Sequence, residues 1–138
     1  MASKSEQFVL FYIGQEQYAL PALTVNKFIE FKDLTLIPKV NKEVKGLIYN
    51  NGHIITIIDI KEILKIKSTK SNKQPMCLIF ESSGHHYGLV VDQGGEITSV
   101  NKIFTDRQKK IFNKYFKTKD KKNIYILEAN QIVSQIGL

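Results

Sequence analysis

The stretch Leu-Ile-Tyr-Asn-Asn-Gly-His-Ile-Ile-Thr-Ile-Ile-Asp, residues 47–59, decides the fold class of this 138-residue chain. Asn51 and Gly52 separate its two apolar runs, and both of these residue types tolerate the positive φ angles of a two-residue hairpin turn. The runs themselves are rich in Ile, which favours an extended backbone. The stretch therefore predicts two antiparallel strands joined by a tight turn.

Similar short apolar runs occur along the rest of the chain, and turn residues separate most of them. The full set covers residues 8–13, 28–31, 46–49, 54–58, 76–80, 87–91 and 124–127. No helical segment of about 10–15 residues alternates with these runs, which argues against a doubly wound parallel sheet. We therefore expect a mainly antiparallel β protein.

Two short helices and one linker are also expected. Asp59 with Glu62, and Thr105 with Gln108, have the spacing of a helix-capping box. The second predicted helix would carry apolar residues at helical spacing, namely Ile111, Phe112, Tyr115 and Phe116. The polar stretch 65–75 is the predicted linker.

The chain repeats itself weakly at a constant offset of 69 residues. Residues 9–11 match 78–80, residues 18–20 match 87–89, Phe28 matches Ile97, and residues 57–64 match 126–133. The offset stays constant over four separate segments, which favours two similar lobes over a chance match. Lobes of this size bury little surface alone, so we expect a shared core and a binding groove between them.

The positive charge is concentrated in one segment, residues 101–122. Nine of the 20 basic residues and two of the 13 acidic residues lie there, so this segment carries the whole formal excess of +7. The rest of the chain is balanced, whereas a nucleic-acid-coating protein usually spreads its basic residues over several elements. We interpret the segment as a solvated basic surface.

Few residues offer catalytic or metal-binding chemistry. A single cysteine, Cys77, excludes an internal disulfide and a thiolate metal cluster, and its apolar surroundings predict a buried side chain. His85 and His86 are adjacent and would face opposite sides of a strand, while His53 follows the hairpin turn. Asp59 and Asp92 each follow a strand, where an aspartate usually caps a turn or helix. We therefore predict no catalytic residue, no metal site and no cofactor.

Four stretches, taken in order along the chain, carry a family pattern. They are residues 8–14 with 17–21 and Val25; Ile37-Pro38 with 44–47 and 52–60; Tyr87-Gly88-Leu89-Val90-Val91-Asp92; and 126–133. Together they cover nearly the whole sequence. In these stretches the chain resembles the CheW family of chemotaxis coupling proteins.

The resemblance implies a fold of two interlocked SH3-like five-stranded β barrels with short helices. The chain would form a single CheW-like domain over residues 1–138, with approximate lobes at 15–80 and 81–138 and the N-terminal strand packing across them. The start of the sequence is polar, and no run of apolar residues is long enough for a membrane span. We therefore expect a cytoplasmic protein without membrane insertion.

The resemblance also implies a non-catalytic adaptor in chemotaxis signalling. Such a protein would join the regulatory domain of the histidine kinase CheA to the cytoplasmic tips of chemoreceptors, with no small-molecule substrate and no cofactor. The residues at the corresponding family positions are the candidates for contact with the receptor or the kinase: Val25, Lys27, Gly46, Asn51 and Gly52.

Two of these positions depart from the family pattern. The turn that commonly carries Arg-Gly is Asn51-Gly52 here, and the common Val-x-Glu becomes Val25-Asn26-Lys27. Asparagine lacks the guanidinium fork, and the change from Glu to Lys reverses the local field. This surface would therefore recognise a different complement if it binds a receptor.

Two alternatives stay open. In the first, the chain is a CheW-like scaffold in a different signalling complex. In the second, it is a small basic β-barrel protein that binds nucleic acid through a basic patch, with Tyr115 and Phe116 stacking on bases. The patch would comprise Lys109, Lys110, Lys114 and Lys117.

Overall fold

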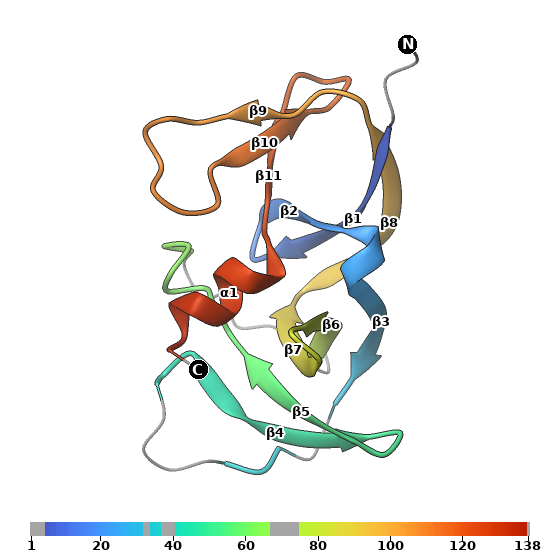
Figure 1. The fold of residues 1–138 in the computed structure, drawn as a ribbon, viewed down its shortest axis with the longest axis vertical. Helices are drawn as coiled ribbons and strands as arrows, with labels where there is room; N and C mark the ends of the chain where they lie inside the picture. Colours follow the sequence, from blue (N-terminus) through green and yellow to red (C-terminus); the bar gives the residue numbers. More distant parts are fainter. Residues whose placement is uncertain (1–4, 32–33, 37–40, 67–74, 138) are drawn as a thin grey trace.

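The computed structural model describes residues 5–31, 34–36, 41–66 and 75–137 (Figure 1). Most of the predicted linker therefore lies outside the described residues. The described strands are β1 (Glu6–Ile13), β2 (Glu16–Pro21), β3 (Val25–Glu30), β4 (Val44–Asn50), β5 (His53–Ile58), β6 (Met76–Ser82), β7 (His85–Val91), β8 (Gln93–Val100), β9 (Phe104–Thr105), β10 (Lys114–Lys117) and β11 (Asn123–Ile126). A 3-10 helix, η1 (Ala22–Thr24), and an α-helix, α1 (Ala129–Gln135), complete this part of the chain.

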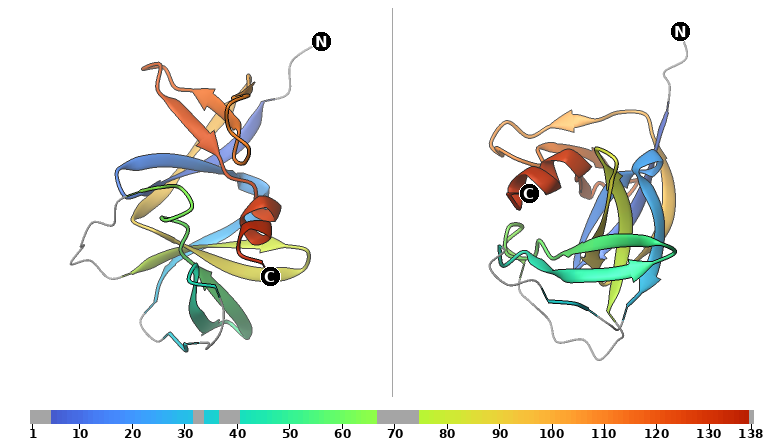
Figure 2. Two further views of the ribbon diagram at one scale, coloured as in Figure 1. Left: turned by 90° about the vertical axis from the view of Figure 1, so that its left-hand side faces the viewer. Right: turned by 60° about the horizontal axis from the view of Figure 1, so that its bottom comes forward.

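The strands form two sheets, which confirms the mainly β fold. The six-stranded sheet has the order β8-β1-β2-β11-β10-β9, and the five-stranded sheet has the order β3-β6-β7-β5-β4. The β4–β5 hairpin lies at one end of the molecule and the strands β9, β10 and β11 lie at the other, with α1 between them (Figures 1 and 2). The predicted hairpin at 47–59 is present, with positive φ at both Asn51 and Gly52.

The internal repeat predicted from the sequence is confirmed by strand pairing. Shifting the residue numbers by 69, upward for β3, β4 and β5 and downward for β6 and β7, converts the order β3-β6-β7-β5-β4 into β8-β1-β2-β11-β10. The registers agree as well, because Phe80 pairs with Tyr87 in one sheet and Phe11 pairs with Tyr18 in the other. The two sheets are therefore copies of one topology, and β9 is an addition to one of them.

The two halves of the chain exchange their first hairpins. The β1–β2 hairpin pairs with β8 and β11 from the second half, whereas the β6–β7 hairpin pairs with β3 and β5 from the first half. This exchange interlocks the halves. Strand pairing alone does not test the lobes at 15–80 and 81–138, and they stay a prediction.

The core has three parts that follow from this arrangement. The largest is shared: it combines Phe11 of the six-stranded sheet, Phe80 of the five-stranded sheet and Ile132 of α1, each 0% exposed. A second cluster lies within the six-stranded sheet and a third within the five-stranded sheet. Because the shared cluster draws on both halves, we expect neither half to be stable without the other.

The helix predicted after Asp59 is wrong, because residues 61–65 form turns. The Asp59 carboxylate accepts a hydrogen bond from the Lys61 amide at 3.0 Å, which closes a side-chain turn over two residues. The Glu62 side chain does not complete a capping box but pairs with Lys42 at 2.7 Å. The Leu64 amide makes an α-helical bond to the Ile60 carbonyl at 3.0 Å, but the next two amides bond to Glu62 and Lys61 with different spacings, so no regular helix forms.

The helix predicted after Thr105 is also wrong, since β9 and β10 form there instead. The expected apolar face is divided between two cores: Phe112 packs in the shared core, whereas Phe116 packs within the six-stranded sheet. Phe112 has a positive φ of 49°, which interrupts any helix. Pairing of β10 with β11 satisfies the backbone here, so tertiary contacts override the helical spacing.

Candidate functional site

A small surface hollow gathers two of the five residues predicted to bind a partner. It has a volume of about 230 Å³ and lies where β3, the β4–β5 turn, β5, β6 and β7 meet. The residues lining it are Asn26, Lys27, Asn50, Asn51, His53, Ile55, Ile79 and His86. We call it the Lys27 hollow.

Strand register explains why these residues meet. Lys27 is the cross-strand partner of Ile79. The parallel pairing of β5 with β7 begins at Thr56 and Tyr87, the residues that directly follow Ile55 and His86. Ile55 and Ile79 are each 2% exposed and belong to the core within the five-stranded sheet. The hollow therefore opens above that core: polar side chains form its rim, which we call its mouth, and Ile55 and Ile79 form its apolar floor.

The imidazole rings of His53 and His86 contact each other in a tilted arrangement at the mouth of the Lys27 hollow. Their centroids are 4.4 Å apart and the rings are inclined by 36°. Among the described residues, neither ring nor the Lys27 ammonium has a hydrogen-bond or ion-pair partner. The sequence placed each histidine separately on a strand or beside a turn. Only the long-range pairing of β5 with β7 brings the two rings together.

The other three predicted partner-binding residues lie outside the lining of the hollow. Gly52 neighbours Asn51 in the exposed turn, and half-buried Val25 packs against the shared core. Gly46 is buried: a Cβ there would lie 2.4 Å from the carbonyl oxygen of Thr35. Close packing against Thr35 therefore explains why glycine occupies position 46, without any contact to a partner protein.

The four lysines predicted as a basic patch are not gathered on one face. Lys109 lies over the Tyr125 ring at 3.6 Å from its centroid, and Lys117 lies over the Phe104 ring at 5.4 Å. Lys114 donates to the Thr105 hydroxyl at 3.1 Å, while Lys110 is exposed in the turn before β10. Lys114 and Lys117 are three residues apart in one strand, so their side chains face opposite sides of the sheet.

The aromatic residues proposed for base stacking are engaged within the protein. Phe116 is 4% exposed and packs in the core, so its ring is not available to a base. Tyr115 lies between Phe104 and Tyr125, with ring centroids at 5.4 Å and 5.2 Å. These packing contacts argue against the nucleic-acid alternative.

A hydrogen bond joins Tyr125 to Asp106 beside these rings. The phenol donates to Asp106 Oδ2 at 2.7 Å. Because the bond favours the neutral phenol and the charged carboxylate, it raises the pKa of Tyr125 to about 12 and lowers the pKa of Asp106. Asp106 and Tyr125 therefore help to fix the β9–β10 turn against β11.

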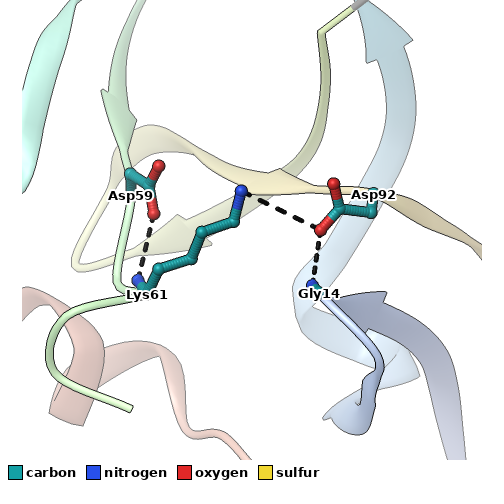
Figure 3. Close-up of polar contacts among 4 residues, drawn as sticks. All are labelled: Gly14, Asp59, Lys61 and Asp92. Carbon is teal, nitrogen blue, oxygen red and sulfur yellow. Dashed lines mark hydrogen bonds and ion pairs between the residues drawn. The ribbon is translucent and has the colours of Figure 1, made fainter. Parts of the chain in front are cut away.

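Asp59 and Asp92 have the structural roles expected of turn aspartates. Asp92 Oδ2 accepts the Gly14 amide at 2.5 Å and lies 4.0 Å from the Lys61 ammonium (Figure 3). Asp92 stands between β7 and β8, where the chain passes from one sheet to the other. This polar junction therefore ties the β1–β2 turn to the end of β5.

The Cys77 thiol is not placed to act as a nucleophile. The thiol is buried, and this burial raises its pKa to about 12, which keeps it protonated. Within the described ranges, no cluster of three or more His, Cys, Asp or Glu side chains could hold a metal ion. No helix in this part of the chain is long and apolar enough to cross a membrane.

The fold and the hollow define a class of protein, a small internally duplicated β domain with a polar mouth over one of its cores. The sequence model of the CheW-like domain matches residues 7–137, so the chain belongs to the CheW-like domain family. The crystal structure of the scaffolding protein TtCheW from Thermoanaerobacter tengcongensis is similar, with a TM-score of 0.79 and 26% identity. The match covers 89% of this chain and 88% of that one.

Two curated relatives carry the description chemotaxis protein CheW. The Helicobacter pylori protein is 25% identical over 100 residues, which cover 72% of this chain and 61% of that protein. The Klebsiella aerogenes protein is 22% identical over 95 residues, which cover 69% of this chain and 57% of that protein. The chain thus spans about three fifths of the length of the curated relatives it matches.

Proposed function

We propose that this chain is a cytoplasmic, non-catalytic adaptor that couples chemoreceptor tips to the regulatory domain of the histidine kinase CheA. The observation that carries the proposal is the structural likeness to a scaffolding protein over 89% of the chain. The curated relatives described as chemotaxis proteins support the same role. Recognition would take place between protein surfaces, without a cofactor.

The Lys27 hollow is our proposed contact region for one of these partners. It joins β3, β5, β6, β7 and the β4–β5 turn, and its Lys27, His53 and His86 side chains have no hydrogen-bond or ion-pair partner among the described residues. Polar groups over an apolar floor are typical of recognition sites, since an apolar floor strengthens each polar contact. Val25 and Gly52 would contribute to the surrounding surface.

The test is direct binding to the CheA regulatory domain and to a receptor hairpin tip from the same organism. We expect a complex with each, and we expect Lys27→Gln to weaken at least one complex by about tenfold. Glu96→Gln is the matched control, because Glu96 occupies the position equivalent to Lys27 in the six-stranded sheet. Absence of binding to either partner, with the chain folded, would overturn the proposal.

A second candidate is a CheW-like scaffold in a different signalling complex. It is favoured by one observation: both departures from the family pattern, Lys27 and Asn51, line the same hollow. If this candidate is correct, Lys27→Glu combined with Asn51→Arg should strengthen binding to a standard chemoreceptor. Equal binding by the natural and doubly substituted chains would remove it.

A further inference from the structure

The Lys27 hollow presents a set of hydrogen-bond donors. Its lining supplies one ammonium, from Lys27, two imidazoles, from His53 and His86, and three carboxamides. Among the described residues that line it, none is acidic. Every polar side chain of the lining can therefore donate to an anion.

We propose that this hollow binds a carboxylate side chain, Asp or Glu, of a protein partner, and binds it more tightly as the pH falls. The inference rests on the proposed function in that the partner is a docking protein. It goes further by naming the chemistry of the contact and its regulation. Neither the ammonium nor the imidazoles form an ion pair with an acidic side chain within the described chain.

The size of the hollow favours a single side chain over a small-molecule ligand. Its volume of about 230 Å³ is below the range of about 300–1,000 Å³ that is usual for drug-sized ligands. The floor of Ile55 and Ile79 is 2% exposed at each residue, so a carboxylate entering the mouth would lie against apolar surface. Lower local polarity strengthens the attraction between the carboxylate and the Lys27 ammonium.

The stacked histidines make this attraction depend on pH. Imidazole is the side chain that ordinarily changes its charge between about pH 5 and 8. Rings with centroids 4.4 Å apart repel each other when both are protonated, and Lys27 adds a third positive charge to the same hollow. A bound carboxylate relieves that repulsion, so proton uptake by the rings and carboxylate binding promote each other.

The charged groups that face the rings come from two elements. Lys27 approaches from β3, and Glu81 on β6 is the cross-strand partner of His86. The β4–β5 turn contributes only the uncharged Asn50 and Asn51. Glu81 also lines another cavity, together with Glu6 and Glu128, but its pairing with His86 makes it an internal competitor for a protonated His86. Its removal should strengthen carboxylate binding.

The experiment uses the full chain and a defined probe, N-acetylglutamic acid α-amide, with N-acetylglutamine α-amide as the neutral control. NMR signals of the His53 and His86 rings are followed at about pH 5.5 and about pH 8. We expect saturable shifts with the acidic probe only, and affinity about tenfold higher at the lower pH. Lys27→Gln and His86→Gln should weaken binding, whereas Glu81→Gln should strengthen it.

The matched control is Lys117→Gln, which removes a lysine from the opposite end of the molecule and should leave the titration unchanged. Equal shifts with the acidic and neutral probes, or an affinity that Lys27→Gln and pH leave unaltered, would overturn the inference. Correct folding of each variant is checked from the amide spectrum.

A second measurement separates this inference from the proposed function. Binding of the receptor tip and of the kinase domain is repeated at both pH values. If a partner binds without dependence on pH or on Lys27, the carboxylate site is wrong and the adaptor function stands. If the acidic probe binds as described but neither partner does, the carboxylate site stands and the adaptor function falls.

Discussion

The two sheets share one topology but have different surfaces at equivalent places. The mouth of the five-stranded sheet is the Lys27 hollow, and its counterpart in the six-stranded sheet is a cavity of about 580 Å³. The floors correspond, since Ile79 and Leu10 are both buried and are related by the offset of 69. The rims differ in charge, because Lys27 in the rim of the Lys27 hollow corresponds to Glu96 in the rim of the other cavity.

The comparison shows that equivalent residues stay apolar in the cores of the two sheets, whereas the residues around the two openings differ. A floor residue must fill a fixed space in a packed interior, whereas a rim residue has only to remain soluble or to meet a partner. The second rim carries Lys102, Lys117 and Lys119. The connection between β10 and β11, residues 118–122, is longer than the two-residue turn between β4 and β5. The two ends of the molecule therefore present different side chains to solvent.

The largest predicted effect concerns the shared core that joins the two sheets. Phe11→Ala and Phe80→Ala remove equivalent rings, each 0% exposed, and each should lower the free energy of unfolding by roughly 3–5 kcal/mol. Urea unfolding followed by circular dichroism should show one transition in each variant, because both rings lie in one cluster. Loss of a single sheet, with the other still folded, would contradict the shared core.

A smaller effect is expected where the two sheets differ by one methyl group. Gly88 corresponds to Ala19, and a Cβ at Gly88 would lie 2.7 Å from Ile57 Cδ1 and 3.0 Å from Cys77 Sγ. Gly88→Ala should therefore destabilise the chain by about 1–3 kcal/mol through overpacking. The matched change Ala19→Gly should cost only about 0.5–1 kcal/mol, and a larger loss for Ala19→Gly than for Gly88→Ala would refute this reasoning.

The polar junction of Asp92 can be compared with the surface pair of Lys42 and Glu62. Asp92→Ala leaves the Gly14 amide without its acceptor and should destabilise the chain by about 1–3 kcal/mol. Lys61→Met should destabilise the chain less than Asp92→Ala, because the ammonium is 4.0 Å from the Asp92 carboxylate.

Glu62→Gln should leave the unfolding midpoint unchanged, since the side chains of both Lys42 and Glu62 are well exposed. A midpoint shift for Glu62→Gln that matches Asp92→Ala would be inconsistent with this ranking.

The smallest effect concerns Tyr125, whose equivalent in the five-stranded sheet is Thr56, which has no phenol. Tyr125→Phe removes the hydrogen bond to Asp106, so the pKa of Asp106 should rise toward its usual range. The folded state holds this pKa low, so the bond contributes stability above the unfolded-state pKa and loses that contribution as the pH falls through the folded-state pKa. Carboxyl NMR titration of both chains measures the change, and identical Asp106 titrations would show that the bond is absent in solution.

The strands could be predicted because their signals are local. Alternating and continuous runs of Ile, Val and Phe mark β strands, and the turn of Asn51 and Gly52 joins two of them by residue type alone. The repeat at an offset of 69 even anticipated the equivalence of the two sheets. The two helices were predicted wrongly because their capping and apolar spacings are also local, and strand pairing and two separate cores overrode them.

The candidate site was predicted only in part. Lys27 and Asn51 came from a resemblance to a family pattern, whereas His53 and His86 carried no local signal that joined them. They lie 33 positions apart in sequence, and only the parallel pairing of β5 with β7 stacks their rings. The four lysines of the predicted basic patch show the opposite case. They are close in sequence, but the two faces of β10 and the turn before it separate them in the structure.

The sequence by itself determined the β class, the hairpin, the duplication and the membership of a recognisable family, because each depends on residue types at short or constant spacing. Only the tertiary structure decided that the first hairpins are exchanged between the halves, and which side chains meet at each mouth. The physical reason is that strand exchange depends on the burial of Phe11 and Phe80 in one shared core. Such burial is a property of the whole packed chain, which no local pattern encodes.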